Sequence, residues 1–225
     1  MIEDLPLYIS ILFGITVVVT GMWIYAASRS RRFLMLMVIW TTIQSVLGLR
    51  GMYQDTEAMP PKIMLFGVLP ALLLIVIIFL SPKGKAFVDS ILLKPLTFFH
   101  VIRVPVEIVL FLLFTQGWVS RYMTFEGTNF DVFSGITAPL VGYIVFRSGR
   151  IHRKLLLGWN LLCLLLLLNV VIIAIFALPS PFQMISLDQP NAAVLYFPFN
   201  LLPTVVVPLV LFGHLVALRQ LTKKT

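Results

Sequence analysis

Residues 155–178 read LLLGWNLLCLLLLLNVVIIAIFAL, an uncharged run of 24 residues. At about 1.5 Å of rise per residue, a helix of this length exceeds the roughly 30 Å hydrocarbon core of a bilayer. Six further apolar runs occur in the 225-residue chain, in which 60% of the residues are hydrophobic and only 12% are charged. Soluble domains carry about twice that share of charge. The sequence therefore predicts an all-α polytopic membrane protein, a bundle of seven transmembrane helices.

The polar links between the apolar runs set the boundaries of the spans. We predict the seven spans at residues 5–27, 33–49, 63–80, 92–116, 130–146, 155–178 and 194–218. No link is long enough for a separate soluble domain of about 50 residues. Residues 1–225 are therefore expected to form a single domain, with any ligand site between helices or at their ends.

Basic residues alternate between the two sides of the predicted bundle. The segments that follow the first, third, fifth and seventh spans hold 13 of the 17 Lys and Arg residues. These are Arg29, Arg31, Arg32, Lys83, Lys85, Lys94, Arg147, Arg150, Arg153, Lys154, Arg219, Lys223 and Lys224. Because short cytoplasmic loops are enriched in Lys and Arg, we expect the N-terminus outside and the C-terminus in the cytoplasm. The net charge of +8 then reflects topology and contact with anionic lipids, and no nucleic-acid partner is expected.

Ionisable residues inside the spans concentrate in the fourth one. His100, Arg103 and Glu107 follow one another at i, i+3 and i+7. On a helix they lie within an arc of roughly 60° and over roughly 10 Å of rise, which predicts one polar stripe facing the bundle interior. Intramembrane charges are costly and usually mark function. Pro105 frees the carbonyl of Val101 and adds a bend beside the stripe.

Two interpretations of this stripe stay open from the sequence. In the structural one, Arg103 and Glu107 form an i, i+4 ion pair that neutralises itself. In the functional one, Arg103 binds an anionic or zwitterionic ligand, Glu107 is a protonatable switch and His100 is a proton relay.

The seventh span is the second unusual element, because Pro198, Pro203 and Pro208 recur in it every five residues. Each proline leaves a backbone carbonyl without its helical partner. Broken helices at membrane depth are tolerated where they pack in protein or line a cavity. Asn200 and Thr204 lie between these prolines, and we expect them to contribute to a ligand site.

His214 lies at a depth in the seventh span comparable to that of His100, so the two imidazoles could hold a haem iron as an alternative. A hydrogen-bonded contact between helices is the simpler role for them. The single cysteine, Cys163, is interpreted as a packing residue. No metal site and no catalytic residue is predicted, because the sequence has no H-E-x-x-H, G-x-S-x-G or phosphate-binding glycine motif. An enzymatic role is not expected.

Three strings in the second half of the chain resemble those of a group of uncharacterised bacterial seven-span integral membrane proteins. They are Phe99-His100-x-x-Arg103-x-Pro105-Val106-Glu107, Thr124-Phe-Glu-Gly-x-Asn-Phe-Asp131 and Pro190-Asn-x-x-Val-Leu-Tyr-Phe-Pro198. The resemblance implies a multi-pass protein of the bacterial cytoplasmic membrane, and it implies no activity.

The sequence thus predicts a protein that binds or translocates a small polar or anionic solute between the fourth and seventh spans, with proton linkage through Glu107. The first alternative is a sensor or a subunit that docks a protein partner or a second copy of itself. The second alternative is a haem-binding redox subunit that uses His100 and His214.

Overall fold

The computed structural model describes residues 2–147 and 151–223, and these residues form helices and connecting loops with no strand. Five helical segments are long and apolar enough to cross a membrane. They are Leu7–Ser28, Arg31–Leu49, Leu93–Thr115, Arg153–Phe176 and Leu202–Thr222. A sixth is added if the bent pair Met64–Leu80 and Pro82–Ser90 counts as one span. The fold is therefore that of a helical membrane protein.

The helices follow the first six predicted spans closely in sequence. Their bounds are α1 Leu7–Ser28, α2 Arg31–Leu49, α3 Leu69–Leu80, α4 Pro82–Ser90, α5 Leu93–Phe99, α6 Arg103–Thr115, α7 Val132–Phe146, α8 Arg153–Phe176 and α9 Val207–Thr222. Short 3₁₀ segments are η2 His100–Ile102, η3 Arg121–Met123 and η4 Ala193–Leu195, and π-helical turns are η1 Met64–Val68 and η5 Leu202–Val206. The fifth predicted span corresponds to α7, whose 15 residues make it a shorter apolar helix.

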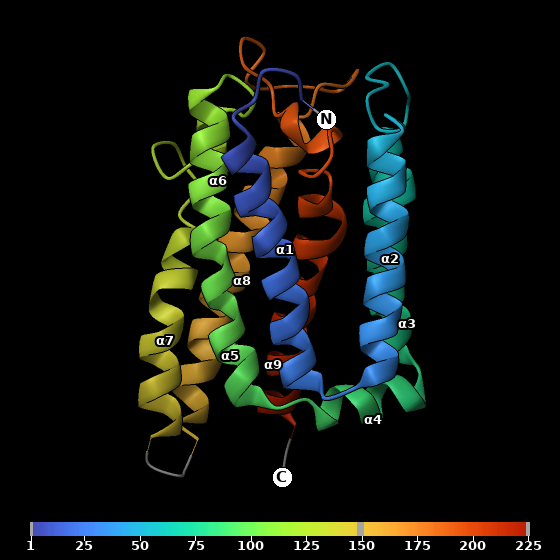
Figure 1. The fold of residues 1–225 in the computed structure, drawn as a ribbon. Helices are drawn as coiled ribbons and strands as arrows, with labels where there is room; N and C mark the ends of the chain where they lie inside the picture. Colours follow the sequence, from blue (N-terminus) through green and yellow to red (C-terminus); the bar gives the residue numbers. More distant parts are fainter. Residues whose placement is uncertain (1, 148–150, 224–225) are drawn as a thin grey trace.

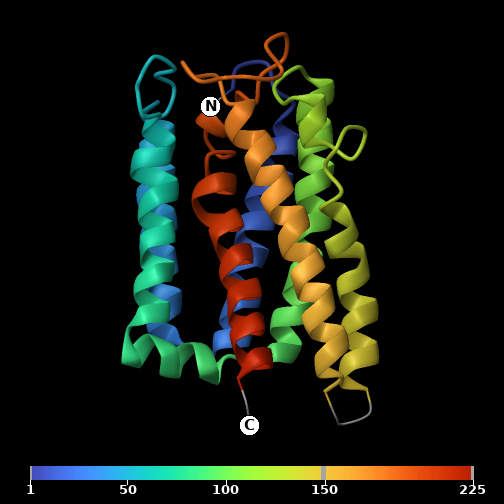
Figure 2. The ribbon, with the colours of Figure 1, turned by 180° about the vertical axis from the view of Figure 1, so that it is seen from behind.

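The long helices run side by side, and α9 lies in the middle of the bundle. Figure 1 shows α1 in front of α9, and Figure 2 shows α9 from behind, between α3 and α8. The helices α2 and α3 stand together at one side of the bundle. Residues of α9 are accordingly among the most buried, as Phe212, His214 and Val216 show with at most 1% exposure. A site built on α9 is surrounded by protein.

The predicted third span ends in a turn that leads into a further helix, where only a polar link was expected. Ser81 caps α4 by accepting a hydrogen bond from the Gly84 amide, and Pro82 occupies the first turn. The axis of α4 is bent by 92° from that of α3. This helix therefore runs across the end of the bundle, as Figure 1 shows.

The seventh predicted span is helical over only part of its length. The helix proper begins at Leu202, so the predicted start at residue 194 is wrong by eight residues. Pro198 and Pro203 supply no N–H groups, so a regular hydrogen-bond ladder cannot run through this stretch. Residues 193–201 contain η4 and hydrogen-bonded turns instead.

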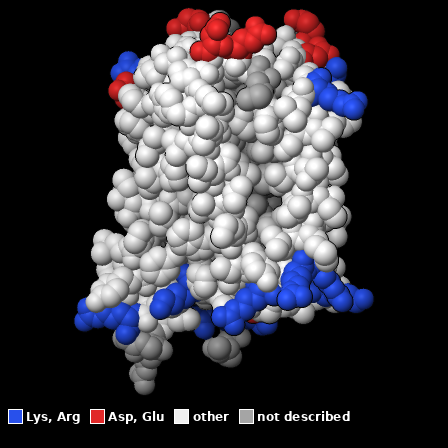
Figure 3. All heavy atoms as spheres, in the orientation of Figure 1, with Lys and Arg blue, Asp and Glu red and all other residues white. Residues whose placement is uncertain are grey.

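Charged side chains gather at the two ends of the bundle. Figure 3 shows Asp and Glu side chains at the end where the N-terminus lies and most Lys and Arg side chains at the opposite end. Two of the basic residues counted above, Arg150 and Lys224, lie outside the described residues. The middle of the molecule shows almost no charge on this face.

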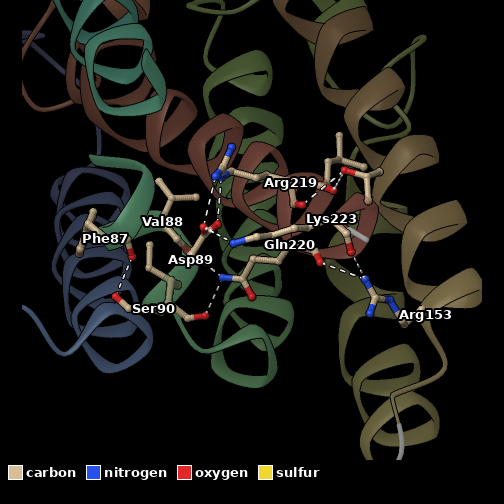
Figure 4. Close-up of polar contacts among 11 residues, drawn as sticks. Phe87, Val88, Asp89, Ser90, Arg153, Arg219, Gln220 and Lys223 are labelled. Carbon is tan, nitrogen blue, oxygen red and sulfur yellow. Dashed lines mark hydrogen bonds and ion pairs between the residues drawn. The ribbon is translucent and has the colours of Figure 1, made fainter. Parts of the chain in front are cut away.

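At the basic end, α4 is tied to the last turn of α9. Asp89 accepts from Arg219 Nε at 2.9 Å and from Lys223 Nζ at 2.8 Å, while Gln220 donates to the carbonyls of Val88 and Ile91 (Figure 4). Arg153, at the start of α8, donates to backbone carbonyls at the end of α9. The two cations hold the pKa of the Asp89 carboxyl down, at about 2.

Candidate functional site

The polar stripe of the fourth span is buried, as its spacing predicts. Residues 93–115 form one continuous helical segment in which η2 separates α5 from α6. His100, Arg103 and Glu107 are each at most 3% exposed. They face the bundle interior, where the loop before α7, together with α8 and α9, supplies the hydrogen-bond partners of Arg103 and Glu107.

Arg103 is paired with Asp131, the residue just before α7. Arg103 Nη1 lies 2.7 Å from Asp131 Oδ1, and both side chains are almost fully buried. The same nitrogen donates to the Cys163 carbonyl of α8 at 3.3 Å. The Arg103–Glu107 ion pair that the i, i+4 spacing suggested is therefore wrong, because the carboxylate of Asp131, just before α7, pairs with the guanidinium.

His214 is the third partner of Arg103, so the fourth and seventh predicted spans touch. Arg103 Nη2 lies 2.8 Å from His214 Nε2. A guanidinium can only donate, so Nε2 accepts and the ring proton is on Nδ1. Nδ1 then donates to Asn160 Oδ1, 2.9 Å away. Both ring nitrogens of His214 are occupied by protein.

The two imidazoles lie face to face. The rings of His100 and His214 are stacked with centroids 4.1 Å apart and planes inclined by 20°. A haem iron needs a free nitrogen from each axial histidine, on opposite sides of the porphyrin. His214 has no free nitrogen, and the stacked rings leave no space for a macrocycle between them. These residues do not fit a haem, and the haem alternative is dropped.

Glu107 is held by an amide. Asn129 Nδ2 donates to Glu107 Oε1 at 2.7 Å and also to the Met123 carbonyl at 2.8 Å. Asn129 Oδ1 accepts from the backbone N–H of Asp131. The loop before α7 thus positions both carboxylates. Asp131 lies against Arg103, whereas Glu107 has only a neutral partner.

A cavity of about 130 Å³ borders Arg103, Glu107 and Asp131. It lies between α6, α8, α9 and the two π-helical turns. Nineteen of the 23 described residues that line it are apolar. The four polar ones are Arg103, Glu107, Asp131 and Asn191. Binding sites for small molecules commonly combine apolar walls with a few convergent polar groups.

Three of these polar side chains have unused hydrogen-bonding capacity within the described structure. Arg103 Nε, Glu107 Oε2 and both polar atoms of the Asn191 amide are buried and have no partner. An unsatisfied buried polar group costs about 1–3 kcal/mol, and more when it is charged. The cavity is thus a place where a bound molecule would find both apolar contacts and open polar groups.

Asn200 and Thr204, which we predicted at the ligand site, do not line this cavity. Asn200 Nδ2 donates to the Gln44 carbonyl of α2, and Thr204 Oγ1 donates to the Asn200 carbonyl. Thr204 borders a second, smaller and otherwise apolar hollow between α2, α3 and α9, on the side where Figure 3 shows a vertical furrow. These two residues join the broken helix to α2.

The sequence did not identify Asp131, Asn129 and Asn191 as site residues, because Asn129 and Asn191 lie in polar links and Asp131 is the second residue of the predicted fifth span. A usable signal was the position of Asp131 as the one acidic residue of the predicted fifth span. Asn160 of α8 forms a contact between helices through its hydrogen bond with His214 of α9. Among residues 2–147 and 151–223, no group of three or more His, Cys, Asp or Glu side chains is arranged to hold a metal ion.

Comparison with known families gives one match. The family model described as Domain of unknown function (DUF8737) matches residues 60–222. This range includes every residue that lines the cavity and the polar residues His100, Arg103, Glu107, Asn129, Asp131, Asn160 and His214. No curated protein and no solved structure matches the chain.

Proposed function

The chain belongs to the DUF8737 family, whose description states no activity, and on the site alone we propose that it is a membrane protein that binds a small solute in the cavity beside α6 and carries it across the bilayer. The observation that supports this is the cavity itself, in which three buried side chains have unused polar atoms. In a bilayer such groups have no water to satisfy them, so a solute is the natural partner.

The proposal includes the topology. We propose seven spans, with Met64–Leu80 and Val132–Phe146 as the third and fifth, an external N-terminus and a cytoplasmic C-terminus. The separation of acidic and basic side chains to opposite ends supports this orientation (Figure 3). Location in the cytoplasmic membrane of a bacterium rests on the sequence resemblance described above.

Glu107 is the protonatable group of the proposed site. Arg103 on its own helix and Asp131 before α7 are the charged groups beside it, and Asn129 and Asn191 are the neutral ones. Asp131 already compensates the charge of Arg103. The empty site therefore has no net charge only when Glu107 carries a proton. Binding and protonation at Glu107 would then be linked.

The first test asks whether the cavity holds a solute. Purified full-length protein is screened by its thermal unfolding midpoint against cationic, neutral and anionic compounds of one aromatic ring. Ala174→Leu on α8 fills the cavity, and Ala26→Leu, on the exposed side of α1, is the matched control. At least one compound should raise the midpoint of the wild type and of Ala26→Leu but not that of Ala174→Leu. If no compound distinguishes the two variants, the proposal is wrong.

The second test separates transport from sensing. A compound that binds is radiolabelled, and its counterflow into proteoliposomes is compared for the wild type and Ala174→Leu. Counterflow that is lost in the variant supports transport. Binding without counterflow would leave the cavity as the ligand site of a sensor.

A further inference from the structure

We propose that the solute is a small organic cation with an apolar body, such as a protonated arylalkyl amine, and that Glu107 binds its ammonium group. This inference rests on the proposed function, because it names the class of molecule that the same cavity takes. It is carried by the charge balance, the lining and the size of the cavity.

The charged side chains that line the cavity are two carboxylates and one guanidinium. Asp131 and Arg103 compensate one another at 2.7 Å. Glu107 is left with a neutral amide on Oε1 and with no partner on Oε2. An ionised buried carboxylate is stable only when a cation or several donors compensate it. A bound ammonium group would supply both the charge and the hydrogen bond that Glu107 lacks.

An anionic solute is a poor match for the same site. Both terminal nitrogens of Arg103 are already used, Nη1 by Asp131 and Cys163 and Nη2 by His214. Nε has no partner, and Nη2 carries one further N–H. A bound anion would therefore share the cavity with two carboxylates and find at most two N–H donors, both from a cation that Asp131 already compensates. The geometry does not favour the role of Arg103 as an anion partner.

The walls of the cavity exclude a strongly hydrated solute. With 19 of 23 lining residues apolar, a sugar or an inorganic ion would leave most of its hydrogen bonds unmade. The volume of about 130 Å³ is close to that of an apolar cavity of about 150 Å³ that accommodates benzene. One aromatic ring or a short alkyl chain is thus the expected body of the ligand.

The probes are benzylamine, benzyl alcohol and benzoate, which share a ring and differ in charge. Their affinities for the full-length protein in detergent are measured by titration at pH 7, where benzylamine is a cation. Ala174→Leu serves as the reference, because its larger side chain reduces the volume of the cavity and leaves partition into the micelle unchanged. Benzylamine should bind at least about tenfold more tightly than benzyl alcohol or benzoate, as a charge-assisted hydrogen bond provides.

Variants of Glu107 test the assigned contact. Glu107→Gln should weaken benzylamine about tenfold or more and change benzyl alcohol less than about twofold. Glu107→Asp keeps the charge and should retain part of the preference, and Glu126→Gln, in an exposed loop, should change nothing.

Three results would overturn the inference. If benzoate or benzyl alcohol binds as tightly as benzylamine, the cavity does not select a cation, although solute binding itself would stand. If Glu107→Gln weakens all three probes equally, Glu107 shapes the cavity and does not pair with the ligand. If none of the probes binds better to the wild type than to Ala174→Leu, the proposed function falls as well.

Discussion

Arg103 connects three elements of the bundle through one guanidinium. It donates to Asp131 before α7, to the Cys163 carbonyl of α8 and to His214 of α9. Removing one partner of a buried ion pair leaves the other charge uncompensated and costs about 3–5 kcal/mol. The stability of this cluster therefore depends on Asp131 more than on Glu107, which makes no bond to Arg103.

This difference gives a prediction at the residue scale. Asp131→Asn should lower the free energy of unfolding by about 3–5 kcal/mol, because Arg103 loses its counter-charge. Glu107→Gln should cost about 1 kcal/mol or less, because the Gln oxygen can still accept from Asn129. Urea unfolding of both variants in one detergent measures the two values.

Asp188→Asn is the control, since Asp188 is exposed in a connecting loop and its change should stay within about 0.5 kcal/mol. A large loss of unfolding free energy in Glu107→Gln together with a small one in Asp131→Asn would mean that Glu107, and not Asp131, is the ion-pair partner of Arg103.

At the scale of elements, two π-helical turns have the same construction. In η1 the Leu69 amide bonds to Met64 and Pro70 follows, and in η5 the Val207 amide bonds to Leu202 and Pro208 follows. Each proline leaves the carbonyl four residues earlier without a backbone donor. π-helical turns often occur at functional sites, and both of these border the cavity.

The two freed carbonyls are bound by side chains of one helix. Gln44 Nε2 donates to the Phe66 carbonyl at 3.0 Å, and Trp40 Nε1 donates to the Thr204 carbonyl at 2.8 Å. Gln44 is oriented by Tyr53, whose hydroxyl donates to its side-chain oxygen. Burial raises the pKa of Tyr53 to about 12, so this hydroxyl stays protonated. Side chains on one face of α2 thus bind the carbonyls that the prolines leave free in both π-helical turns.

We predict that the indole N–H of Trp40 contributes to the stability of the fold. Trp40→Phe keeps most of the ring and should cost about 1–3 kcal/mol, because the Thr204 carbonyl is left unpaired. Pro208→Ala restores a backbone N–H, so the same substitution of Trp40 should cost less in that background. A double-mutant cycle of unfolding free energies measures the coupling.

Trp23→Phe on α1 is the matched control for loss of an indole. If Trp40→Phe costs the same in the wild type and in the Pro208→Ala variant, the hydrogen bond does not compensate the proline.

At the scale of the whole molecule, the basic end is closed by contacts between α4, α8 and α9. Asp89 binds Arg219 and Lys223, and Arg153 binds the end of α9 (Figure 4). These contacts hold α4 across the ends of the long helices.

The Asp89 contacts predict a dependence of stability on acid. The pKa of Asp89 is held at about 2 in the folded protein, below its ordinary value of 3.8, first by the hydrogen bonds from Arg219 and Lys223. Because the folded pKa is lowered, the contribution is complete above about pH 4 and is lost as pH falls towards 2. The thermal midpoint of Asp89→Asn should therefore lie below that of the wild type at pH 6, and the gap should close between pH 4 and 2.

Asp188→Asn is again the comparison, and it should show no gap at either pH. A gap for Asp89→Asn that does not change between pH 6 and 2 would mean that the carboxylate charge is not what ties α4 to α9.

The proposed orientation of the whole chain can be tested by cysteine labelling. Cys163 is fully buried, so Cys163→Ser provides a background without reactive thiols. In that background, Glu3→Cys should react with a membrane-impermeant maleimide in intact cells, and Lys83→Cys should react only after lysis. Both positions are exposed. The reverse pattern would invert the topology, and labelling of both in intact cells would contradict the placement of α4 in the cytoplasm.

The sequence by itself determined the helical membrane character, the bounds of most helices and the inward face of the fourth span. Hydropathy and helical period are properties of neighbouring residues, so apolar runs of about 20 residues and an i, i+3, i+7 stripe can be read directly. It also located the broken helix of the seventh span, although the prolines delayed the start of the regular helix to Leu202.

The tertiary structure alone decided which groups meet. Arg103 bonds to residues 28 and 111 positions further along the chain, and the spacing within its own helix suggested Glu107 instead. Asn200 and Thr204 contribute to the contact with α2, whereas Asn191, from the loop before η4, lines the cavity. Pairing between helices depends on their rotation and depth in the bundle, which packing sets and which no local pattern encodes.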